Sequence, residues 1–81
     1  MNEPQIYEAL TRIFRDEFDD ETLTVSAATR AADIPDWDSN RHIQIIAALE
    51  ARFGVKINTG EIEAMKSVGD MVRLIQKKHR P

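Results

Sequence analysis

Ser39 is the residue best placed for chemistry in this chain, because a carboxylate precedes it and an imidazole follows three positions later. Asp38, Ser39 and His42 match the acid, nucleophile and base of a serine hydrolase, and the last two share one side of any helix that contains both. A hydrolase also needs an oxyanion hole and a substrate pocket, which a chain of 81 residues hardly provides. We therefore expect no catalysis from this group.

The surroundings of Ser39 favour a different chemistry, the attachment of a phosphate ester. An acidic loop ends and an apolar helix begins at this serine, in the run from Asp36 to Gly54, Asp-Trp-Asp-Ser-Asn-Arg-His-Ile-Gln-Ile-Ile-Ala-Ala-Leu-Glu-Ala-Arg-Phe-Gly. A serine there is exposed, and the amides of a helix N-terminus favour a phosphate ester on its oxygen. Because serine is also a preferred N-cap, a purely helix-capping role is the alternative.

Other site chemistries find little support in the composition. The chain has no cysteine, which excludes disulfides and thiolate metal sites, and its two histidines, His42 and His79, are far apart in sequence. We predict no metal site, and we expect His42 to be solvated or to face a partner. We expect Trp37, near the serine, to anchor the loop by packing rather than to stack on a ligand.

Charge is unevenly distributed along the chain. Residues 1–40 hold three arginines against ten acids, a net charge of −7, and residues 41–81 hold eight lysines and arginines against four acids, a net charge of +4. Because the acidic half includes the loop before Ser39, we expect no nucleic-acid partner. No apolar run reaches membrane-spanning length and the first four residues are not typical of a signal peptide, so we expect a cytoplasmic chain without a membrane partner.

Apolar periodicity predicts three long helices and one short one, over residues 3–18, 39–53, 59–66 and 68–79. The apolar faces of the first two consist of Ile6, Leu10, Ile13, Phe14 and Phe18, and of Ile43, Ile46, Leu49 and Phe53. Capping pairs mark three helix starts: Asn2 with Gln5, Asn58 with Glu61, and Ser67 with Asp70. These elements form one small all-α domain, residues 1–81, a four-helix bundle.

Residues 19–38 show no clean period and predict a long loop between the first and second helices. Its apolar residues are expected to hold it on the bundle; they are Leu23, Val25, Ile34 and Trp37. A short turn is expected near residues 28–32. The basic run at residues 77–81 suits a helix C-terminus and is expected to fray.

The run around Ser39 resembles the attachment site of acyl and peptidyl carrier proteins, in which the serine of an Asp-Ser-Leu motif carries phosphopantetheine. The resemblance extends over nearly the whole chain, since the Ala48-Leu49-Glu50-Ala51-Arg52-Phe53 ending, the connector, the short third helix and the closing helix follow the family's order and lengths. It implies a freestanding, monomeric carrier with the four-helix bundle of the acyl carrier type.

The family's function is then expected at the matching positions. Ser39 would accept 4′-phosphopantetheine through a phosphodiester, and the thiol of that arm would hold an acyl or aminoacyl group as a thioester. Asp38 matches the acid that helps a phosphopantetheinyl transferase and its magnesium ion engage the serine. The chain itself would be no enzyme, because the cofactor carries the reactive group.

The resemblance also implies where other molecules bind. The transferase and the acyl-loading and acyl-processing enzymes of a fatty acid-like, polyketide or specialised pathway would dock on four residues, Asn40, Arg41, Gln44 and Ile45. Five apolar residues would part to shelter a fatty chain: Ile43, Ile46, Leu49, Ile62 and Met65.

The sequence departs from the family at Asn40, where carriers usually have leucine or methionine. Arg41, Gln44 and Arg52 also make the second helix less acidic than in fatty acid carriers, so we predict poor exchange with generic fatty acid enzymes. An unmodified interaction domain of the same fold therefore stays open. A helix-turn-helix DNA-binding domain is disfavoured by the long connector after Gly54 and by the acidic first half. The cargo itself stays open, among acetate-derived chains, hydroxy acids, glycerate-like units and amino acids.

Overall fold

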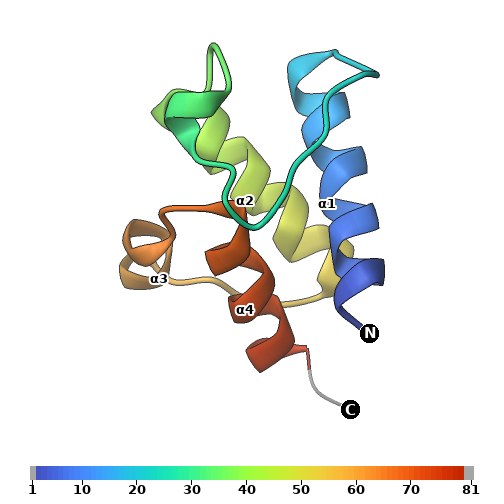
Figure 1. Cartoon of the computed structure of the whole chain (residues 1–81). Helices are drawn as coiled ribbons and strands as arrows, with labels where there is room; N and C mark the ends of the chain where they lie inside the picture. The colour runs from blue at the N-terminus through green and yellow to red at the C-terminus, as the bar shows by residue number, and fades with distance from the viewer. Residues whose placement is uncertain (1, 80–81) are drawn as a thin grey trace.

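Four α-helices and one short 3₁₀ turn form the bundle in the computed structural model of the protein, which describes residues 2–79 (Figure 1). In chain order they are α1 (Glu3–Phe18), η1 (Ala31–Asp33), α2 (Ser39–Phe53), α3 (Thr59–Ala64) and α4 (Val68–Lys78). No strand occurs within those residues. The predicted all-α class, with three long helices, a short third helix and a long loop after the first, is confirmed.

Side-chain caps fix the starts of three helices. Asn2, Asn58 and Ser67 each accept a hydrogen bond from the backbone N–H three residues later, and the side chain there reaches back to the cap. The three predicted capping boxes are thus confirmed, and each N-cap contributes about 1 kcal/mol. Two of the residues that reach back to a cap are acids, Glu61 and Asp70. The pKa of the Glu61 carboxyl is lowered by hydrogen bonds from the Asn58 N–H and from Lys78, and the pKa of the Asp70 carboxyl is lowered by a hydrogen bond from the Lys66 N–H.

The third helix ends at Ala64, two residues before the expected boundary. Met65 leaves helical geometry with φ −80° and ψ 105°. The backbone N–H groups of Lys66 and Ser67 donate to Asp70 Oδ2 at 2.8 and 3.2 Å. These two residues therefore serve the start of α4 rather than the end of α3.

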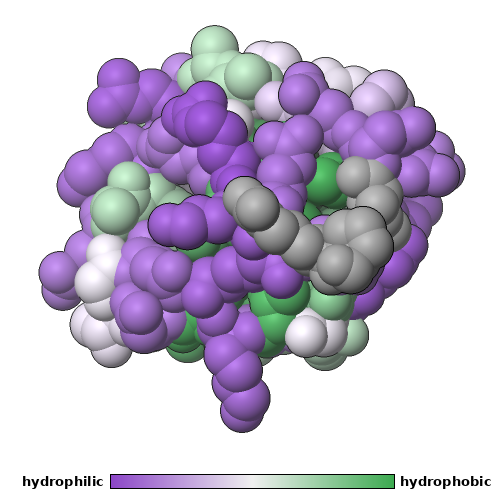
Figure 2. Space-filling view, turned by 90° about the horizontal axis from the view of Figure 1, so that it is seen from below, coloured by the Kyte–Doolittle hydropathy of each residue, from purple (hydrophilic) through white to green (hydrophobic). Residues whose placement is uncertain are grey.

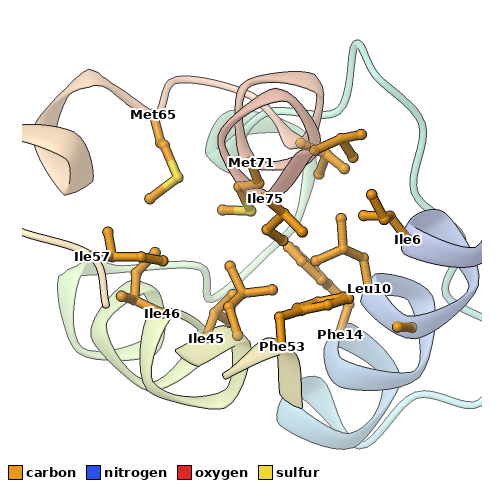
Figure 3. Close-up of a cluster of buried hydrophobic side chains, with 14 of the residues drawn as sticks. Ile6, Leu10, Phe14, Ile45, Ile46, Phe53, Ile57, Met65, Met71 and Ile75 are labelled. Carbon is orange, nitrogen blue, oxygen red and sulfur yellow. The ribbon is translucent and has the colours of Figure 1, made fainter. Parts of the chain in front are cut away.

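The core lies where α1, α2 and α4 meet (Figure 3). Its largest fully buried side chains are Phe14, Ile6, Leu10, Ile45, Leu49, Met71, Ile75 and Val68. The connector after α2 and the end of α3 add Ile57 and Met65, which lie beside Ile46 in the close-up. Among the described residues no polar or charged residue is buried, so hydrophobic packing holds the helices together.

The long loop is tied to the start of α4 by its backbone. The N–H of Val68 donates to the Thr29 carbonyl at 2.9 Å, and the N–H of Gly69 donates to the Ala27 carbonyl at 3.0 Å. Both are first-turn amides that a helix cannot pair internally. In Figure 1 the loop dips to the first turn of α4 for this reason. Its expected anchors are confirmed, since Ile34 is buried and the other three apolar residues, Leu23, Val25 and Trp37, pack against the core.

α1 begins and α4 ends at the lower end of the bundle in Figure 1, and Figure 2 views that end. Hydrophilic residues dominate this face, with hydrophobic residues visible between them. α4 ends at Lys78 with His79 as its C-cap, and the last residues of the expected fraying run, Arg80 and Pro81, lie outside the described residues. None of the helices in residues 2–79 combines the length and apolar character needed to cross a membrane.

Candidate functional site

Ser39 is the first residue of α2, and Asp38 before it is the helix cap. Asp38 Oδ1 accepts from the Arg41 N–H at 2.9 Å, and the Asp38 carbonyl accepts from the His42 N–H at 2.9 Å. The alternative in which Ser39 serves as N-cap is therefore wrong, because the preceding carboxylate already fills that role. Ser39 is exposed, and its hydroxyl has no hydrogen-bond partner among residues 2–79.

A tight turn delivers the chain into this position. Asp36 adopts the left-handed conformation with φ 70°, which aspartate tolerates better than most residues. The Trp37 N–H donates to the Ile34 carbonyl at 3.3 Å, and the Asp38 N–H donates to the Asp36 carbonyl at 3.0 Å. The turn directs the Trp37 side chain inward and leaves Asp38 and Ser39 outside.

Trp37 packs against the end of α1, as expected. Its ring lies edge-on to Phe14 at 5.1 Å between centroids and to Phe18 at 6.4 Å. The His42 ring stacks on the same indole at 5.9 Å, and Trp37 Nε1 donates to His42 Nδ1 at 3.3 Å. His42 is thus partly buried and hydrogen-bonded to Trp37, so the expectation that it is solvated is wrong, whereas a partner-facing role stays a prediction because the residue also lines the groove beside Ser39.

The expected docking residues fall into three different environments. Asn40 and Gln44 are exposed on α2. Arg41 turns toward α1, where its guanidinium donates to the Glu17 carbonyl, lies 3.1 Å from Glu17 Oε2 and covers the Phe18 ring at 5.5 Å.

Gln44 adds to the same cluster, because with its amide nitrogen turned toward α1 it donates to Glu17 Oε2 at 2.9 Å. Ile45 is 0% exposed in the core, so its expected docking role is wrong. Its place in the sequence next to Gln44 does not put it on the same face, because neighbouring helical residues point in different directions.

An open groove of about 1020 Å³ begins at Ser39 and runs between η1, the first turn of α2 and α3. Three of the five expected acyl-pocket residues line it, Ile43, Ile62 and Met65. The other two, Ile46 and Leu49, are part of the closed core at 3% and 0% exposure. Ile43 is 56% exposed and is the only large hydrophobic side chain described as exposed in residues 2–79.

Sequence reasoning missed the opposite wall of this groove. Arg30 and the η1 residues Ala31, Ala32 and Asp33 form it, and the region around them carries no periodic signal. The Arg30 N–H donates to Asp33 Oδ2 at 3.0 Å. The position of Asp33 three residues after Arg30 was the sequence signal that could have indicated this turn. In the described part of the chain, no cluster of three or more histidine or acidic side chains is arranged to hold a metal.

Two curated relatives of this chain are acyl carrier proteins. An acyl carrier protein from Thermosynechococcus vestitus is 35% identical over 79 residues, covering 96% of each chain. One from Lactobacillus acidophilus is 31% identical over 76 residues, covering 94% of this chain and 95% of the relative.

The fold gives the same result. The solution NMR structure of the holo acyl carrier protein from Geobacter metallireducens matches with a TM-score of 0.83 at 42% sequence identity, covering 89% of this chain and 83% of the other. No family model matches the chain. Since two carriers align with it over nearly their full lengths and a third shares its fold, this chain belongs to the acyl carrier protein family.

Proposed function

We propose that this protein carries acyl or aminoacyl groups as thioesters on a 4′-phosphopantetheine arm attached to Ser39. One observation supports the choice of residue most strongly. Ser39 has an exposed, unpartnered hydroxyl at the start of α2, because Asp38 supplies the helix cap in its place. When bound, the arm would supply a thiol that forms the thioester.

The residues around Ser39 fit a phosphodiester. The Arg41 N–H donates to the Asp38 carboxylate, while the N–H groups of Ser39 and Asn40 have no acceptor among residues 2–79. First-turn amides and the positive end of the helix dipole suit a singly charged phosphodiester. The groove beside Ser39 adds a surface of mixed polarity along which an arm can lie.

Enzymes that load and process the cargo are proposed to approach the exposed part of α2. Asn40, Ile43, Gln44 and Ala47 form an uncharged stripe there, next to Ser39. Docking on this stripe relies on shape and apolar contact, because Arg41 is already paired with Glu17. The protein would act on no substrate itself and would be modified by a phosphopantetheinyl transferase.

Intact mass after co-expression with a broad-specificity phosphopantetheinyl transferase tests the proposal. We expect a gain of one phosphopantetheinyl group, absent in Ser39→Ala. A second variant, Asn40→Leu, restores the residue that carriers usually have after the serine. Modification of Asn40→Leu alone would favour the unmodified interaction domain for the natural chain, and no modification of either would overturn the carrier proposal.

A further inference from the structure

His42 and Trp37 form a hydrogen-bonded pair beside Ser39, and the proposed carrier function gives neither residue a role. The Trp37 Nε1–His42 Nδ1 distance is 3.3 Å, and the rings stack at an interplanar angle of 28°. Trp37 is itself fixed by Phe14 and Phe18 at the end of α1. The imidazole is therefore held in one orientation by a side chain that packs against the core.

This contact determines which ring nitrogen of His42 can donate. An indole N–H only donates, so Nδ1 must accept and carries no proton in the neutral ring. The proton of neutral His42 is then on Nε2. No other hydrogen bond to the His42 ring occurs in the described residues, which leaves Nε2–H as an unused donor.

The position of His42 brings this donor to the attachment serine. Ser39 and His42 are three residues apart on α2, so their Cβ atoms are neighbours at about 5–6 Å. Both side chains line the same groove. A phosphodiester on Ser39 Oγ would therefore lie beside the His42 side chain.

The other basic groups near Ser39 are placed differently. The Arg41 guanidinium is bound to Glu17 and Phe18 on the α1 side. Arg30 and Lys66 line the groove from η1 and from the α3–α4 connector, together with the acids Asp33, Asp38 and Glu63. His42 is thus the donor on the same helix face as the serine.

We propose that His42, oriented by Trp37, binds the phosphodiester that joins the arm to Ser39, with Nε2–H donating to a phosphate oxygen. This inference rests on the proposed function of Ser39. The hydrogen bond would limit rotation about the Ser39 side chain and direct the arm toward the groove floor at Ile43, Ile62 and Met65. His42 would be a binding residue, and Trp37 a positioning residue that acts through it.

NMR of the modified protein tests the proposal. The phosphodiester gives a single ³¹P resonance, and the ring nitrogens of both histidines are observable in ¹⁵N-labelled protein. We expect attachment of the arm to shift the Nε2 resonance of His42 and to leave that of His79 unchanged, because His79 is at the far end of α4, against Phe53. This comparison needs no substitution.

The ³¹P resonance of the phosphodiester is then compared between the wild type and three variants. His42→Phe keeps an aromatic ring against Trp37 but has no donor, so we expect a displaced and narrower ³¹P line, because the phosphodiester gains local motion. The matched control His79→Phe is expected to leave the line unchanged. Trp37→Phe keeps the aromatic contacts to α1 but frees the imidazole, and a smaller displacement is expected.

The outcomes separate this inference from the proposed function. One outcome would overturn the role of His42 and leave Ser39 as the attachment site. In it the mass shows an attached arm, but the His42 Nε2 resonance does not change on attachment and the ³¹P line of His42→Phe equals that of the wild type. If no arm is attached to the wild type, the proposed function fails and the inference fails with it. A changed ³¹P line in His79→Phe as well would also overturn the inference, since the effect would not be local.

Discussion

Asp38 combines two roles, which substitution at this one residue can separate. Its carboxylate caps α2 through the Arg41 N–H at 2.9 Å, and it is the proposed contact for the transferase. Asparagine caps helices as well as aspartate does but carries no charge. The two roles therefore make different demands on the side chain.

We expect Asp38→Asn to keep the unfolding free energy within a few tenths of a kcal/mol and to slow modification of Ser39. Asp38→Ala is expected to slow modification and also to destabilise the domain by about 1 kcal/mol, because the cap is lost. Denaturant unfolding and a time course of intact mass measure the two effects. Modification of Asp38→Asn at the wild-type rate would show that the charge has no part in recognition.

At the level of elements, the contact between the long loop and α4 depends on a glycine. A Cβ built at Gly69 would lie 2.9 Å from the Ala27 carbonyl oxygen and 3.2 Å from the Ala27 Cβ. The carbonyl oxygen is the acceptor for the Gly69 N–H, so the loop cannot move away without weakening that bond. The steric conflict therefore exceeds the gain in helix propensity of up to about 1 kcal/mol.

Gly69→Ala is expected to destabilise the domain by about 1–3 kcal/mol, the usual range for overpacking. Gly60→Ala is the matched control, because a Cβ there meets only Asn58 Oδ1, at 3.5 Å. We expect this control to be neutral or slightly stabilising. Equal unfolding free energies for the two variants in denaturant titrations would contradict the described path of the loop.

The start of α2 is joined to the end of α1 by Arg41 and Glu17. Their side chains are 41% and 16% exposed, so this pair is more protected than most surface ion pairs. It also holds Phe18 under the guanidinium, 5.5 Å from the ring centroid. The pair therefore helps to fix the angle at which α2 presents Ser39.

A double-mutant cycle with Arg41→Met and Glu17→Gln is expected to give a coupling free energy of about 1 kcal/mol. The control cycle on Arg12 and Asp16, whose side chains are 51% and 69% exposed, is expected to give less than about 0.5 kcal/mol. Both are measured by denaturant unfolding. A coupling for the first pair no larger than that of the control would mean that Arg41 is effectively solvated.

At the scale of the whole molecule, the features that depend on neighbours in sequence are predictable. Helical periodicity and capping boxes act over three or four residues, so the all-α class and the caps at Asn2, Asn58 and Ser67 follow from the sequence. The motif around Ser39 and the order of the helices after it are enough to indicate the family. The sequence alone leaves two adjacent candidates for the N-cap of α2, because aspartate and serine are both good caps. In the structure Asp38 is the cap.

The features that depend on distant contacts are not predictable in this way. His42 is half-buried against Trp37, whose direction is set by the left-handed turn at Asp36. The wall of the groove at η1 depends on the bonds from the loop to α4, about 40 residues later in the chain. The family resemblance implies a docking role for Ile45, but this side chain is fully buried in the core.

The location of the modification is the most direct test of the central claim. Trypsin cleaves after Arg30 and Arg41 and releases residues 31–41, in which Ser39 is the only hydroxyl side chain. After reaction with a phosphopantetheinyl transferase, we predict one phosphopantetheinyl group on this peptide and none on any other. An unmodified 31–41 peptide, or a group found on a different peptide, would contradict the assignment of Ser39 as the attachment site.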